Sequence, residues 1–145
     1  MNSTEMLHEN IDVASSTAPG SMTENERSAI REAKAAFEES FKVPCTGCNY
    51  CMPCPQGISI PSLFAAYNES FSLGWRTGFF HYMMSVGVTS KEPRLATHCI
   101  GCGACVKKCP QHINVPERMA DVARRLQPLG VNAALKVANP ILSRW

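Results

Sequence analysis

Apolar side chains recur three or four positions apart along most of the chain, which is the period of an amphipathic helix. Near the start, the stretch "STEMLHENIDVA" has this pattern at Met6, Leu7 and Ile11, which come after Asn2 and Ser3, either of which could cap a helix. Residues 15–21 are rich in Ser, Thr, Pro and Gly. The pattern therefore predicts a first helix followed by a linker.

A second helix is predicted to begin at a capping box. Thr23 stands three residues before Glu26, so each side chain can bond the backbone N–H of the other residue. The helix must end before Pro44, because the residue ahead of a proline disfavours the α region. Four apolar residues share one stripe of this helix: Ile30, Ala33, Phe37 and Phe41.

Further helical patterns follow, two of which open with a proline in the first turn, Pro61 and Pro116, where the missing N–H costs nothing. The predicted segments are 61–71, 76–86, a short helix within 90–98, 116–129, and a tail helix at 131–145 interrupted by Pro140. No segment alternates as a strand does. The sequence therefore predicts an all-α fold in which helices surround two cysteine-rich loops.

The composition argues against several classes of function, among them nucleic-acid binding and membrane insertion. The 145 residues are 45% hydrophobic and 18% charged, with a net charge of +2, and no basic stripe suggests a nucleic-acid partner. The longest apolar stretch, "GFFHYMMSVGV", is too short to cross a membrane. The first residues lack the basic and apolar segments of a secretion signal. We therefore expect a cytoplasmic protein that binds neither nucleic acid nor membrane, with cysteines that are reduced.

All eight cysteines fall in two runs, "CTGCNYCMPCP" at 45–55 and "CIGCGACVKKCP" at 99–110. The second run has the C-x2-C-x2-C-x3-C-P spacing of bacterial ferredoxins that bind two 4Fe–4S clusters, in which the fourth cysteine ligates the other cluster. Glycines in both runs let the backbone approach the inorganic sulfides. This chemistry predicts two 4Fe–4S clusters.

The spacing assigns three cysteines of each run to one cluster and the fourth to the other. One set is Cys45, Cys48, Cys51 and Cys109, and the other is Cys99, Cys102, Cys105 and Cys54. The first run has one residue fewer before Cys54 than the ferredoxin spacing, so spacing alone leaves the partner of Cys54 open.

Three alternatives to iron–sulfur clusters fit the cysteines less well. A zinc site could take a C-x2-C pair from each run but has no use for a third cysteine at the same step or for Cys-Pro. A disulfide framework suits neither a cytosolic chain nor such close spacing. A thioredoxin-like pair needs a βαβ context that the pattern lacks.

The chain also contains a weak internal repeat. Each half consists of a cysteine run, Cys-Pro-Gln, a short apolar segment and an amphipathic helix. The corresponding residues are Ile58, Ile60 and Pro61 in the first half and Ile113, Val115 and Pro116 in the second. Two copies of one unit related by a pseudo-two-fold axis explain this pattern.

Other residues near the cysteines receive simpler interpretations. His98 and His112 are expected to face solvent or the cysteine ligands rather than to bind metal. Lys107 and Lys108 either tune a cluster or dock an acidic partner, or are merely solvated. No acid or base lies near Tyr67 or Tyr82 in the sequence to suggest a catalytic pair, so neither tyrosine is expected to take part in chemistry. A set of large side chains is expected to pack in the core and keep water from the clusters: Tyr50, Trp75, Phe79, Phe80, Met83 and Met84.

The long separation of the two runs, residues 55–98, resembles the α-helical ferredoxin class. The stretches "VPCTGCNYCMPCPQGISIP" and "CIGCGACVKKCPQHINVPERM" are very similar to the C-terminal region of the iron–sulfur branch of the aldo/keto reductases. "MNSTEMLHENIDVASS" and "SMTENERSAI" resemble the helices that come before that region. The resemblance thus covers nearly the whole chain.

This resemblance implies that a (β/α)8 barrel precedes the sequence in a longer oxidoreductase. Residues 1–22 would then be the end of the barrel with a linker, and residues 23–145 a two-cluster α-helical ferredoxin-like domain. No catalytic residue of the barrel matches any part of this chain. The expected function is electron transfer to a partner such as ferredoxin or flavodoxin, and the alternative is a structural clip without redox turnover.

Overall fold

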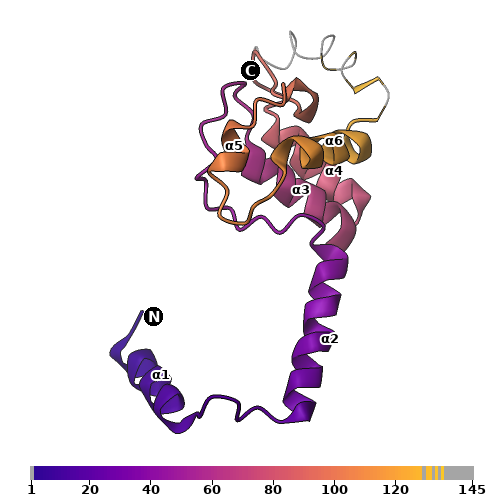
Figure 1. Ribbon diagram of the computed structural model, residues 1–145. Helices are drawn as coiled ribbons and strands as arrows, with labels where there is room; N and C mark the ends of the chain where they lie inside the picture. Colours follow the sequence, from indigo (N-terminus) through magenta and orange to yellow (C-terminus); the bar gives the residue numbers. More distant parts are fainter. Residues whose placement is uncertain (1, 129, 132, 134, 136–145) are drawn as a thin grey trace. The chain divides into compact units, whose positions relative to one another are not determined.

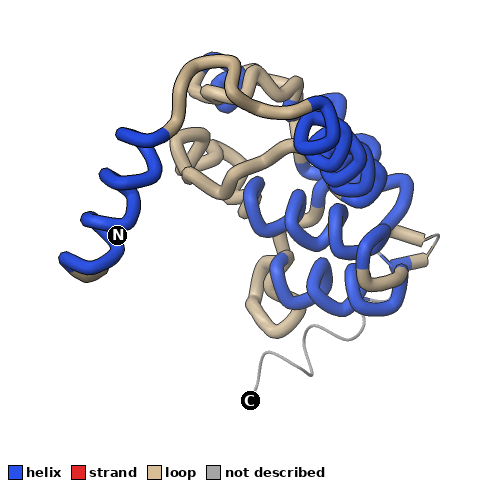
Figure 2. Tube along the Cα trace, turned by 90° about the horizontal axis from the view of Figure 1, so that it is seen from below, coloured by secondary structure: helices blue, strands red, loops and turns tan. Residues whose placement is uncertain are grey.

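Every regular segment of the described chain is helical. The structure, a computed structural model, describes residues 2–128, 130, 131, 133 and 135, and within these residues no β-strand occurs (Figures 1 and 2). The elements are α1 (Thr4–Ser16), α2 (Glu24–Ser40), α3 (Ile60–Ser72), α4 (Trp75–Ser85), the 3₁₀ turn η1 (Ala96–His98), α5 (Ala104–Lys107) and α6 (Val115–Leu126). The predicted all-α fold is therefore confirmed.

The chain divides into two units, Met1–Ala36 and Phe37–Trp145. In the first unit Ser3 caps α1, since its hydroxyl accepts a hydrogen bond from the Met6 N–H at 3.2 Å. The linker begins at Thr17, two residues later than predicted. The predicted boundary after residue 22 stays a prediction.

The capping box that opens α2 is confirmed. The Thr23 N–H donates to the Glu26 carboxylate at 2.7 Å, and the Glu26 N–H donates to the Thr23 hydroxyl at 3.3 Å. The bonds that the Thr23 N–H and the Thr23 hydroxyl donate to the Glu26 carboxylate lower the pKa of this carboxyl, because they stabilise its charged form. Neither α1 nor α2 buries a side chain, and the apolar stripe of α2 is exposed at Ile30 and Phe37.

The core of the second unit lies where α3 packs against α4 and α6 (Figure 1). In α3, Leu63, Phe64 and Tyr67 are buried and Phe71 is half-buried. In α6, Met119, Val122 and Leu126 are buried. The prolines stand in the first turn of α3 and of α6, as predicted.

The interpretation of α4 as packing through all its large residues was wrong. Phe80 and Met84 are exposed on α4, as are Trp75 at its start and Tyr50 in the first cysteine run, while Phe79 and Met83 are half-buried. The side chain that α4 buries completely is Tyr82, for which the sequence suggests no chemistry. Its hydroxyl accepts a hydrogen bond from the Ala96 N–H at 3.1 Å, which satisfies the buried phenol.

Two predicted helices differ in extent. Within 90–98 only the 3₁₀ turn η1 forms. Residues 131, 133 and 135 of the predicted tail helix are helical, and the rest of 131–145, including Pro140, lies outside the described residues. Of the helices in the described part, none combines the length and apolar character that crossing a bilayer requires.

Candidate metal centre

The two cysteine runs share a backbone conformation that the internal repeat places in register. Gly47 and Asn49 of the first run have φ of 69° and 63°, and the equivalent Gly101 and Gly103 have φ of 68° and 71°. These values lie in the left-handed region, which turns the chain sharply. Each run therefore curls in the same way around its first three cysteines.

The repeat extends beyond the fourth cysteine of each run. Gly57 and His112 stand three residues after Cys54 and Cys109, with φ of 69° and 52°. Their N–H groups donate to the carbonyls of those cysteines at 2.8 and 3.1 Å. The same turn thus leads from the fourth cysteine into the helix that follows.

The cysteines line two cavities. The first cavity encloses about 380 Å³, open mouth included, and its cysteines are Cys54, Cys99, Cys102 and Cys105. The second encloses about 350 Å³ on the same measure, and its cysteines are Cys45, Cys48, Cys51 and Cys109. Each cavity therefore combines three thiols of one run with the last thiol of the other, the two sets that the ferredoxin spacing suggested.

The remaining walls of the cavities are also related by the repeat. Ile60 and Val115, the first residues of α3 and α6, line both cavities and so lie between them. The other equivalent pairs, given with the residue of the first cavity first, are Gln56 and Gln111, Ile58 and Ile113, Pro116 and Pro61, and Met119 and Phe64. Apart from these two glutamines, and Thr46 and Asn49 in the second cavity, the wall residues are apolar.

Burial and neighbouring thiols set the protonation of the cysteines. Burial raises the pKa of the Cys45, Cys51 and Cys105 thiols, because a thiolate loses hydration there. The charges of Cys48 and Cys109 raise the pKa of Cys45 further. The charges of Cys45, Cys105 and Cys48 likewise raise the pKa of Cys51. In the protein without metal these three thiols hold their protons, so metal binding must release protons.

Backbone amide donors oppose this effect at all three thiols. The Gly47 N–H lowers the pKa of the Cys45 thiol, and the Cys51 N–H lowers that of its own thiol. The N–H groups of Cys105 and Val106 lower the pKa of the Cys105 thiol. Amide hydrogen bonds to cysteine sulfur are a feature of iron–sulfur sites, where they stabilise the negative charge.

The donor set of each cavity fits a cubane cluster. Four thiols, apolar walls and amide donors suit a negatively charged 4Fe–4S group. All eight cysteines lie in the described part of the chain as free thiols. Within the described residues, no three His, Cys, Asp or Glu side chains are grouped closely enough to hold one metal ion.

The runs differ in how they reach their last cysteine. The first passes through Met52 and Pro53, whose peptide bond is cis, where the second makes the short helix α5. His98, His112, Lys107 and Lys108 are all exposed. Sequence reasoning missed that His112 and Asn49 occupy left-handed positions, although aligning the repeat would have placed them opposite Gly57 and Gly103.

Comparison with known proteins supports this reading of the cysteines. Residues 44–114 match the family model described as "4Fe-4S dicluster domain", which spans both runs. No curated protein and no solved structure matches the chain. The match and the thiols of the two cavities together indicate an iron–sulfur, ferredoxin-like domain at residues 44–114.

Proposed function

We propose that the domain binds two 4Fe–4S clusters through crossed ligands and serves as an electron-transfer module of an aldo/keto reductase-type oxidoreductase. The observation that carries the proposal is the grouping of the thiols, three from one run and one from the other in each cavity. A family model that spans both runs supports it. The sequence similarity to the iron–sulfur branch supports the link to the aldo/keto reductases.

In this proposal Cys45, Cys48, Cys51 and Cys109 hold one cluster, and Cys99, Cys102, Cys105 and Cys54 hold the other. When bound, a 4Fe–4S cluster accepts or releases one electron, at a potential that burial and hydrogen bonds to sulfur adjust. The amides of Gly47 and Val106 provide such bonds. The apolar walls keep water from the sulfurs and so favour a low total charge in each cavity.

The two cavities adjoin each other, which electron transfer between clusters requires. Ile60 and Val115 line both, and the charge of Cys105 in one cavity acts on Cys51 in the other. The aliphatic side chains of Ile60 and Val115 therefore form part of the wall that the two cavities share. Cys48 and Cys102, one in each cavity, are exposed and give each cavity its own side toward solvent.

We further propose that a (β/α)8 barrel precedes this chain and that the parent works in the cytosol. The resemblance of residues 1–16 to the end of such a barrel, and of residues 21–30 to the helix that follows it, supports the first point. On α1, the residues Met6, Leu7 and Ile11 are 43–50% exposed, an apolar surface suited to packing against another domain. Free thiols that bind iron suit a reducing compartment.

The electron carrier outside the chain is proposed to be an acidic one-electron protein such as a ferredoxin or flavodoxin. Lys107 and Lys108 are exposed between the last two cysteines of the second run. Residues 43–59, which contain the first run, carry no charged side chain. Charge complementarity therefore favours docking at the second run.

The test is anaerobic purification, an iron and sulfide count, and reductive titration followed by electron paramagnetic resonance. We expect about eight irons and eight sulfides per chain, since each cluster holds four of each, and signals from two interacting reduced clusters. A count near four would contradict the second cluster. Full occupancy without reduction at any accessible potential would contradict electron transfer and leave the structural clip.

A further inference from the structure

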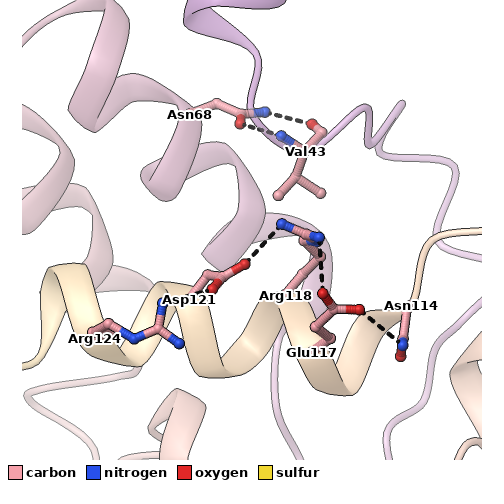
Figure 3. Close-up of polar contacts among 7 residues, drawn as sticks. All are labelled: Val43, Asn68, Asn114, Glu117, Arg118, Asp121 and Arg124. Carbon is pink, nitrogen blue, oxygen red and sulfur yellow. Dashed lines mark hydrogen bonds and ion pairs between the residues drawn. The ribbon is translucent and has the colours of Figure 1, made fainter.

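Asn68 ties the start of the first cysteine run to α3. Its Nδ2 donates to the Val43 carbonyl at 2.8 Å, and its Oδ1 accepts from the Val43 N–H at 3.0 Å (Figure 3). Both residues are buried, Asn68 at 5% exposure and Val43 at 0%. Val43 lies two residues before Cys45, whose own N–H donates to the Val43 carbonyl at 2.8 Å. A fixed Val43 therefore fixes the backbone of the first ligand.

Gln127 makes the corresponding connection in the second half. This residue is the C-cap of α6, and its Oε1 accepts from the Thr97 N–H at 3.2 Å. Its Nε2 donates to the Thr97 hydroxyl at 3.3 Å. Thr97 lies two residues before Cys99, as Val43 lies two residues before Cys45. In each half, a carboxamide from the long helix that follows the cysteine run thus bonds the residue two positions before the first cysteine of that run.

A carboxamide is the side chain that can make both bonds to the Val43 backbone. The backbone at Val43 presents one donor and one acceptor outside any helix or sheet, and a single Asn or Gln can satisfy both. A carboxylate could accept from the Val43 N–H but could not donate to the carbonyl, which would keep the Cys45 N–H as a donor, and an apolar residue would also leave the Val43 N–H unpaired. Asn68 and Gln127 do not stand at equivalent positions of the repeat, and Gln127 bonds the N–H and the hydroxyl of Thr97 where Asn68 bonds the N–H and the carbonyl of Val43.

We propose that Asn68 and Gln127 are positioning residues, each of which holds the first cysteine of one run in place for one cluster. The inference rests on the proposed function, because it assumes that the two sets of four cysteines are ligands. Asn68 serves the set that contains Cys45, and Gln127 serves the set that contains Cys99. The buried Asn68 bonds are expected to matter more than those of the half-exposed Gln127.

The experiment compares Asn68→Ala, Asn68→Asp and Gln127→Ala with the wild type, all loaded with iron under anaerobic conditions. Each protein is exposed to an iron chelator together with an alkylating reagent, and mass spectrometry follows the labelling of every cysteine with time. Asn10→Ala is the matched control, because Asn10 also donates an amide hydrogen bond to a backbone carbonyl but lies on α1, in the other unit.

We expect Asn68→Ala to speed the labelling of Cys45, Cys48, Cys51 and Cys109 about tenfold, the effect of losing a buried hydrogen bond. The other four cysteines should keep the wild-type rate. Gln127→Ala should speed the labelling of Cys99, Cys102, Cys105 and Cys54 by a smaller factor. Asn68→Asp keeps one of the two bonds and should fall between Asn68→Ala and the wild type.

Two failures can be told apart. Equal acceleration of both sets in both variants would mean general loosening of the fold and would overturn the positioning roles. If Asn68→Ala does not fold, Asn68→Asp and Gln127→Ala still decide the outcome. A wild type that binds no iron, or whose cysteines are not released in these two sets of four, would overturn the proposed function instead.

Discussion

At the scale of single residues, the two halves solve one conformational problem with different side chains. Gly103 turns the second run at a left-handed position where the first run has Asn49, and Gly57 does so where the second half has His112. Asparagine tolerates this region better than other residues with a side chain, and β-branched residues tolerate it worst. The left-handed turn, rather than the residue type, is therefore what the two runs share.

Asn49 supplies a direct test of that requirement. Asn49→Gly should keep the iron content and the anaerobic unfolding midpoint of the wild type. Asn49→Val should lower the free energy of unfolding by about 1–2 kcal/mol, since the side chain opposes the left-handed backbone. Both can be measured by guanidinium denaturation under anaerobic conditions. Equal stability of the glycine and valine variants would show that this turn is not needed.

Tyr82 gives a second test, with a defined dependence on pH. Burial raises the pKa of its phenol from 10.0 to about 12. The folded chain therefore keeps a proton that the unfolded chain loses, so this contribution to stability is complete below pH 10 and is lost as the pH rises toward 12. Tyr82→Phe should remove the last-ionising tyrosine from an absorbance titration.

The same variant should be less stable at neutral pH. Without the hydroxyl, the Ala96 N–H loses its acceptor, which costs about 1–3 kcal/mol for a buried group. Denaturation at pH 8 measures this loss. An unchanged unfolding free energy would mean that another acceptor replaces the phenol.

At the scale of elements, α3 and α4 approach each other closely at Gly78. A Cβ there would lie 2.5 Å from the Ser70 Cβ and 2.6 Å from the Ala66 carbonyl oxygen, both on α3. Ser70 also receives the Arg125 guanidinium from α6 on its hydroxyl, at 2.5 Å, and on its carbonyl, at 2.8 Å. The three helices of the core therefore meet around Ser70 of α3, which lies against Gly78 of α4 and Arg125 of α6.

Gly78→Ala is expected to destabilise the protein by about 1–3 kcal/mol, the usual cost of overpacking, although alanine is the better helix former. Arg76→Ala, on the exposed side of the same helix, serves as the control. Thermal unfolding of the two variants measures their stability relative to the wild type. A stabilised Gly78→Ala would show that α3 and α4 can separate freely.

The comparison of elements with sequence shows which features local patterns can predict. The capping box at Thr23 and the prolines that open α3 and α6 act over a few residues, and the sequence placed all of them. In α4 large apolar residues lie on every side, so periodicity could not reveal that Tyr82 faces inward while Phe80 does not.

In the candidate site, too, only the local features could be predicted. The spacing of the runs identified eight thiols and suggested their two sets, because successive ligands within a run are only three or four residues apart. The amide connections of Asn68 to Val43 and of Gln127 to Thr97 join residues 25 and 30 positions apart. No motif predicts such pairs, because they depend on how helices pack against loops.

At the scale of the whole molecule, charge is distributed unequally between the two runs. The double variant Lys107→Gln, Lys108→Gln should slow electron exchange with an acidic carrier several-fold at low salt and reduce the dependence of the rate on ionic strength. Arg76→Gln, which also removes an exposed positive charge, is the control. Stopped-flow kinetics measures both variants. An unchanged rate would place the docking site elsewhere.

The most direct measurement for the whole account is a crystal structure of anaerobically purified protein with anomalous scattering recorded at the iron edge. We predict two compact iron groups, one bonded to Cys45, Cys48, Cys51 and Cys109 and the other to Cys99, Cys102, Cys105 and Cys54. A group ligated by all four cysteines of a single run, or a lone metal ion in either cavity, would contradict the crossed arrangement.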